Sequence, residues 1–144
     1  MPELATPTLN TILVVDDSAT VLMLVGTILE RANFRVLRAD CAASALTLAE
    51  RTVEKIDLLL SDVDMPGMSG PALGETMKKT RQDLRVMLMS GGADGNLLVL
   101  NYGWAFIQKP FIAKKLVEMI SEVLDSPDRS QPGGDGFDSR KDVR

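Results

Sequence analysis

The chain has 144 residues, of which 45% are hydrophobic and 25% charged, and this composition predicts one ordinary globular domain. Its formal net charge of −4 argues against a nucleic-acid-binding surface, which needs an excess of Lys and Arg. The sequence contains no histidine and one cysteine, Cys41, which excludes imidazole metal ligands, histidine-based nucleophile pairs, a phosphohistidine on this chain and an internal disulfide.

Residues 1–10 carry neither the basic n-region nor the apolar h-region of a secretory signal, so we expect a short lead before the folded domain. No apolar run of the sequence is long enough to span a bilayer, and we therefore expect no membrane segment. These two features predict a cytoplasmic protein.

Five short apolar runs alternate with helix-like segments between residue 11 and about residue 124. The predicted strands are residues 11–15, 35–39, 57–61, 85–89 and 105–108. Most of these runs are continuous and rich in Val, Ile and Leu, which is typical of strands covered on both faces of a parallel sheet. The chain order therefore predicts five βα units, and hence an α/β domain with right-handed crossovers.

The first predicted helix begins after Ser18, a suitable N-cap, and ends near Asn33, which tolerates the left-handed conformation. Its core stripe is predicted to consist of Val21, Leu24, Val25, Ile28 and Leu29. Leu22 and Met23 fall off this stripe, close to the predicted site. Both partner docking and incidental exposure would explain these two residues.

Further helices are expected over residues 42–52, after Ser69 with Pro71 in the first turn, and over residues 112–124. The segment 93–101 would hold a short fourth helix of the series.

Residues 126–144 are dominated by Ser, Pro, Gly and charged side chains, so they cannot bury enough surface to offset the entropy of ordering. We expect this tail to be disordered. The predicted domain boundaries are therefore 1–10 for the lead, 11–125 for the folded domain and 126–144 for the tail.

The polar residues that follow the predicted strands indicate a site, because ligands of open parallel sheets bind where the carboxyl ends of the strands form a crevice. These residues are Asp16 and Asp17, Asp62 and Asp64, Ser90, and Lys109. Taken alone, an adjacent Asp pair fits a solvated turn, and Asp64 could simply start the turn that follows it.

Taken together, the acidic residues offer hard oxygen ligands of the kind that suits Mg²⁺. With such an ion bound, one carboxylate could attack a phosphoryl group and become an aspartyl phosphate. Ser90 and Lys109 would then donate hydrogen bonds to the oxygens of the transferred group.

Residues 11 to about 124 resemble the receiver domain of two-component response regulators, through the motifs "VVDDS", "LLLSDVDMPGMSG", "VMLMSGG" and "FIQKPF". The resemblance implies a CheY-like, flavodoxin-like α/β fold, with a (βα)5 doubly wound sheet of five parallel strands between two helix layers. It also implies Mg²⁺ as cofactor, and a histidine kinase or a histidine phosphotransfer protein as the phosphoryl donor.

The resemblance implies a role for each acidic residue of the site. Asp62 would take the phosphoryl group from the phosphohistidine of the partner and would also contact the metal. Asp17 would bind Mg²⁺ directly, Asp16 would act mainly through water, and the main-chain carbonyl of Asp64 would complete the protein ligands.

The resemblance also implies that Ser90 and Lys109 contact phosphoryl oxygens and that Phe106 is the switch aromatic, which fills the space that Ser90 leaves. Three features depart from the family pattern. Ser90 stands where threonine is commoner, Phe106 lacks a hydroxyl, and the segment between Ser90 and Lys109 is a few residues shorter than expected.

The implied function is a single-domain phosphoacceptor module that switches a protein-interaction surface, without a DNA-binding output and without turnover as an enzyme. Its downstream protein target is unknown, and a phosphorylation-dependent homodimer is left open. One alternative is a haloacid-dehalogenase-like phosphohydrolase of small molecules, with Asp62 as nucleophile and Asp64 as acid; the early position of Asp16 and Asp17 argues against it. Another alternative is a receiver fragment of a hybrid histidine kinase.

Overall fold

A five-stranded parallel sheet forms the centre of the protein, whose computed structural model describes residues 9–91 and 103–126. The strands are β1 (Thr11–Val15), β2 (Arg35–Ala39), β3 (Leu58–Asp62), β4 (Arg85–Ser90) and β5 (Ala105–Gln108). Their order across the sheet is β2-β1-β3-β4-β5, so β1 pairs with both β2 and β3. The chain therefore reverses its direction of progress across the sheet at β1, and the carboxyl ends of β1 and β3 border the resulting crevice.

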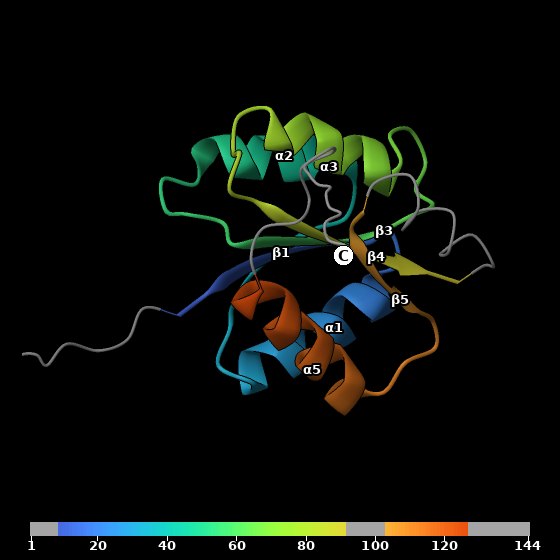
Figure 1. The fold of residues 1–144 in the computed structure, drawn as a ribbon. Helices are drawn as coiled ribbons and strands as arrows, with labels where there is room; N and C mark the ends of the chain where they lie inside the picture. The colour runs from blue at the N-terminus through green and yellow to red at the C-terminus, as the bar shows by residue number, and fades with distance from the viewer. Residues whose placement is uncertain (1–8, 92–102, 127–144) are drawn as a thin grey trace, which may run out of the picture.

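Among the described residues, two helices cover each face of this sheet (Figure 1). The described helices are α1 (Ala19–Arg31), α2 (Ala42–Arg51), α3 (Gly70–Lys78) and α5 (Ala113–Asp125). Helices α1 and α5 lie on one face, and α2 and α3 lie on the other. The predicted three-layer α/β architecture is thus confirmed. The predicted fourth helix and the tail beyond residue 126 lie outside the described residues. None of the described helices is long and apolar enough to cross a membrane.

Side-chain caps set the starts of three helices. The hydroxyl of Ser18 accepts a hydrogen bond from the main-chain N–H of Val21 at 3.3 Å and begins α1. Ser69 begins α3 in the same way, and the sulfur of Cys41 accepts from Ser44 N at 3.4 Å at the start of α2. Asn33 has a φ of 70° just beyond α1, as its sequence position predicted. Because these caps stand next to strand ends, they determine where the chain turns back over the sheet.

The two faces of the sheet bury two separate apolar clusters. The residues of β3 alternate between them: Leu59 packs toward α2 and α3, while Leu58 and Leu60 pack toward α1 and α5. Strand residues point alternately to opposite faces, so both halves of the apolar run are buried. The central strands consequently form a rigid support for the residues at their ends.

The predicted core face of the first helix and the predicted bounds of the third strand were wrong. Leu24, predicted for the core stripe of α1, is 58% exposed, whereas Leu22 is half-buried and packs against the cluster under α1 and α5. The helix is rotated so that Leu22, Val25 and Leu29 face the sheet and α5. The predicted third strand was shifted by one residue, because Asp62 itself pairs with Met89 and belongs to β3.

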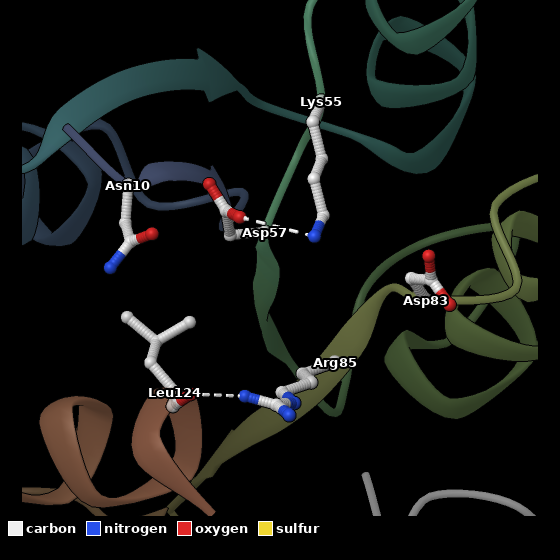
Figure 2. A pocket seen from close by; sticks show the side chains of 6 residues that line it. All are labelled: Asn10, Lys55, Asp57, Asp83, Arg85 and Leu124. Atoms are coloured by element: carbon white, nitrogen blue, oxygen red, sulfur yellow. Dashed lines mark hydrogen bonds and ion pairs between the residues drawn. The ribbon is translucent and has the colours of Figure 1, made fainter. Parts of the chain in front are cut away.

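A pocket of about 320 Å³ opens at the amino-terminal edge of the sheet, where the strands begin (Figure 2). The guanidinium of Arg85 donates hydrogen bonds there to the carbonyl oxygens of Val123 and Leu124, at the end of α5. Asp57 accepts from the main-chain N–H of Thr11 at 2.7 Å. These contacts tie α5 and β1 to the starts of β3 and β4, at the edge opposite the carboxyl ends.

The rotation of α1 can be tested with two substitutions of the same kind. Leu29→Ala should lower the free energy of unfolding by about 2–5 kcal/mol, because the side chain is 0% exposed. Leu24→Ala should change it by about 0.5 kcal/mol or less, because that side chain already contacts solvent. Urea unfolding followed by circular dichroism gives both values. Equal losses in the two variants would contradict the observed rotation.

Candidate functional site

Three carboxylates lie together at the carboxyl ends of β1 and β3. One oxygen from each of Asp16, Asp17 and Asp62 lies within 4.8 Å of the others. Asp16 is 1% exposed and Asp62 is 8% exposed, while Asp17 faces solvent. Two buried acids and one exposed acid therefore form one cluster at this edge of the sheet.

Main-chain contacts hold Asp16 in this position. Its N–H donates to the carbonyl of Ala39 at 3.3 Å, which links the end of β1 to the end of β2. Its Oδ1 accepts from the main-chain N–H of Ser18 at 2.8 Å. Because Ser18 also caps α1, the helix start and the buried carboxylate are locked to one another.

Lys109, which directly follows the last strand, β5, contacts the acids at the same carboxyl end of the sheet. Its Nζ lies 3.0 Å from Oδ2 of Asp16 and 3.2 Å from Oδ1 of Asp62. The main-chain N–H of Lys109 donates to the carbonyl of Ser90 at 2.8 Å, so the end of β4 fixes the segment that carries the ammonium group. One cation thus bridges acids that stand on β3 and directly after β1.

The electrostatics of Asp62 follow from this geometry. Partial burial raises the pKa of its carboxyl group, the charge and hydrogen bond of Lys109 counteract this, and the charges of Asp16 and Asp17 add to the increase. For Lys109, burial alone would lower the pKa, but the hydrogen bond and charge of Asp16, together with Asp62, outweigh it and raise the pKa. The site therefore favours a charged lysine and disfavours a third negative charge.

The other predicted site residues lie around this cluster. Ser90 is 3% exposed at the end of β4. Phe106 is half-buried on β5, opposite Leu88, and packs against the apolar cluster under α2 and α3. Asp64 is exposed two residues beyond the end of β3.

The donor set fits a divalent cation of the Mg²⁺ type. Asp16, Asp17 and Asp62 offer carboxylate oxygens, and the exposure of Asp17 leaves one side open to water and to an anionic ligand. The sequence predicted these acids, but it assigned Lys109 only to a phosphoryl oxygen. Its pairing with Asp16 and Asp62 was missed, because those residues lie 93 and 47 positions away along the chain.

The sequence also passed over Ser61, whose hydroxyl donates to the main-chain oxygen of Asp62 at 2.9 Å, and Gly70, which packs against the same oxygen. The available signal was a hydroxyl at the end of an otherwise apolar run, since such a buried group needs a hydrogen-bond partner.

Comparison with known proteins agrees with the fold. The model of the response regulator receiver domain family matches residues 12–121. A CheY-like response regulator receiver domain protein from Methanospirillum hungatei JF-1 has a TM-score of 0.73 and 33% sequence identity, over 82% of this chain and 95% of that one.

Two longer relatives also match. The chain is 31% identical to the sensor kinase CckA of Brucella abortus over 82% of its own length and 13% of that protein. It is 34% identical to the transcriptional regulatory protein CpxR of Escherichia coli over 81% of its own length and 50% of that protein. The chain thus spans about half the length of CpxR and a much smaller part of CckA. The family match and the cluster of three acids with a lysine at the carboxyl ends of the strands show that this chain belongs to the response regulator receiver domain family of two-component systems.

Proposed function

We propose that this receiver domain takes a phosphoryl group from the phosphohistidine of a partner protein onto the carboxylate of Asp62. The observation that carries the proposal is the burial of Asp62 beside two other acids and within 3.2 Å of Lys109. A carboxylate oxygen of Asp62 would attack phosphorus and form the P–O bond as the P–N bond to the imidazole breaks. The leaving imidazole takes up a proton, and the product is an aspartyl phosphate.

We propose a metal role for the acids around Asp62. Asp17 would bind Mg²⁺ directly, because its side chain is the accessible one, and Asp16 would act mainly through water, because both of its oxygens already accept hydrogen bonds. Asp62 and the main-chain carbonyl of Asp64 would complete the protein ligands. When bound, the cation would offset the negative charge of the transferring group.

The remaining residues would hold the phosphoryl group and transmit its presence. Lys109 would exchange part of its pairing with Asp16 and Asp62 for a phosphoryl oxygen, and the hydroxyl of Ser90 would donate to another. Phe106 would then move toward the space that Ser90 vacates. Since Phe106 packs against the cluster under α2 and α3, this shift would change packing at the surface beside β5.

We propose that residues 11–125 are the receiver domain, with a short lead before and a polar tail after. Receiver domains are signalling modules, and the family match favours this function over the phosphohydrolase alternative. We propose a self-modifying switch whose only reactions are phosphorylation and loss of its own phosphoryl group. Whether the module acts by itself or within a hybrid kinase is a separate question, because the sensor kinase CckA also contains a matching region. The cytoplasmic location stays a prediction from the sequence.

We propose that the phosphoryl donor, a histidine kinase or a histidine phosphotransfer protein, docks on an apolar surface beside the site. This surface, the α1 patch, consists of Met23, Leu24 and Ile112, which are 69%, 58% and 69% exposed. Met23 and Leu24 lie in the second turn of the helix that follows Asp17, and Ile112 lies three residues after Lys109. A downstream protein target and a phosphorylation-dependent homodimer would use the surface beside β5.

The phosphoacceptor is tested by intact-protein mass spectrometry after incubation with acetyl phosphate and Mg²⁺. The native chain should gain one phosphoryl group that hydroxylamine removes, and Asp62→Asn should gain none. A parallel sample with EDTA in place of Mg²⁺ should stay unmodified. Labelling of Asp62→Asn at another residue would contradict the proposal.

Without a bound metal ion, the ionised carboxylate of Asp62 should lower the free energy of unfolding. Because its pKa is raised in the folded protein, stability from this group is present below the unfolded value of about 3.9 and is lost as the pH rises through the folded value. In EDTA at pH 7, Asp62→Asn should therefore be more stable than the native chain, and the difference should shrink as the pH approaches 4. Urea unfolding across this range measures it.

Adding Mg²⁺ at pH 7 should reverse that order. At ten times its dissociation constant, the ion should stabilise the native chain by about 1.4 kcal/mol, and it should stabilise Asp62→Asn less, because a charged ligand is lost. A native chain that is already the more stable of the two in EDTA would argue against this account of the site.

The α1 patch is tested by charge substitution. Met23→Asp and Leu24→Asp should slow phosphotransfer from the kinase that phosphorylates the native chain fastest in a panel of purified kinases, by about tenfold. Labelling by acetyl phosphate should be unchanged, because that donor needs no protein interface. Val53→Asp is the matched control, since Val53 is 95% exposed but lies between α2 and β3, away from the carboxyl ends. Unchanged transfer to the α1 variants would exclude this docking surface.

A further inference from the structure

The residue before the phosphoacceptor carries a buried hydroxyl that no other part of the site uses. Ser61 is 0% exposed, and its position in β3 places it on the same face as Leu59, toward α2 and α3. Its Oγ donates a hydrogen bond to the main-chain oxygen of Asp62 at 2.9 Å. An apolar side chain would suit this face of the sheet, and the hydrogen bond to Asp62 offsets the cost of burying the hydroxyl.

The first residue of helix α3 packs closely against the same main-chain oxygen. A Cβ atom built on Gly70, the first residue of α3, would lie 2.2 Å from the oxygen of Asp62 and 3.1 Å from Oγ of Ser61. Only a residue without a side chain allows this approach. The main-chain N–H of Gly70 also donates to the carbonyl of Val63 at 2.9 Å, which holds the helix start against the end of β3.

The peptide group that follows Asp62 is therefore restrained on several sides. Ser61 donates to its oxygen, Gly70 packs against that oxygen, and its N–H, which belongs to Val63, donates to Met89 of β4 at 2.9 Å. The directions of the peptide planes at a residue determine where its Cβ points. Restraint of this peptide consequently restrains the carboxylate of Asp62 relative to its acidic neighbours and Lys109.

We infer that Ser61 and Gly70 are positioning residues, which act through the main chain of Asp62 to aim its carboxylate at the incoming phosphorus. The inference rests on the proposed phosphoacceptor role of Asp62. Phosphoryl transfer depends on placing the nucleophile in line with the leaving group, and a misplacement of about 1 Å can slow a reaction by about 100-fold. Ser61 and Gly70 would thereby affect the rate of phosphoryl transfer without contacting the reacting atoms.

The test compares four variants labelled by acetyl phosphate at saturating Mg²⁺, of which Ser61→Thr is the rescue variant. Ser61→Ala removes the hydrogen bond without adding atoms, and Gly70→Ala forces the helix start away from Asp62. Gly74→Ala is the matched control: it lies one turn further along α3, and its new Cβ would meet the side chain of Trp104 at 3.0 Å instead of the main chain of Asp62. Urea unfolding gives the folded fraction of each variant, and each rate is expressed per folded molecule.

Ser61→Ala and Gly70→Ala should label at least about tenfold more slowly than the native chain, while Gly74→Ala should stay within about twofold despite its loss of stability. Ser61→Thr, which restores a hydroxyl, should recover most of the native rate. A normal rate in Ser61→Ala, or a rate in Ser61→Thr as low as that of Ser61→Ala, would overturn the inference and leave the phosphoacceptor role intact. Failure of the native chain to label would instead overturn the proposed function.

Discussion

The close placement of the acids at the carboxyl ends of the strands depends on the ammonium group of Lys109. This group lies 3.0 Å from Asp16 and 3.2 Å from Asp62. Both acids are almost fully buried, and two carboxylates so close together repel one another strongly where water is scarce. The lysine offsets this repulsion and, through its main-chain bond to Ser90, also ties β5 to β4. The proposed binding of a cation or a phosphoryl group would redistribute the charges that Lys109 balances through this pairing.

The strands and helix starts around the charge cluster restrain the residues that form it. The four charged members of the cluster stand at or just beyond the ends of strands whose interiors are apolar and covered on both faces. Helix starts add further restraints: Ser18 donates to Asp16 while capping α1, and Gly70 brings α3 against the main chain of Asp62. Rigid placement would matter for the proposed phosphoryl transfer, because that reaction depends mostly on positioning and charge stabilisation.

Membership of the receiver family identifies this chain as a signalling module of two-component systems. The same kind of domain matches part of a sensor kinase and half of a transcriptional regulator, so the surrounding protein, and not the cluster of acids, determines what the signal does. Individual receivers must therefore differ on their surfaces. In this chain the exposed apolar side chains of the α1 patch form the surface on which we propose that the phosphoryl donor docks.

The sequence by itself determined the order of strands and helices and the residue types at the strand ends, because these follow from local periodicity, capping residues and the alternation of apolar and polar segments. It predicted β1, β2 and β5 with their observed bounds, Ser18 as the cap of α1, and a helix that begins after Ser69. Only the tertiary structure decided the rotation of α1, which exposes Leu24, and the pairing of Lys109 with Asp16 and Asp62 across 93 and 47 residues. Those features depend on how elements distant in the chain pack against each other, and a local pattern carries no information about such packing.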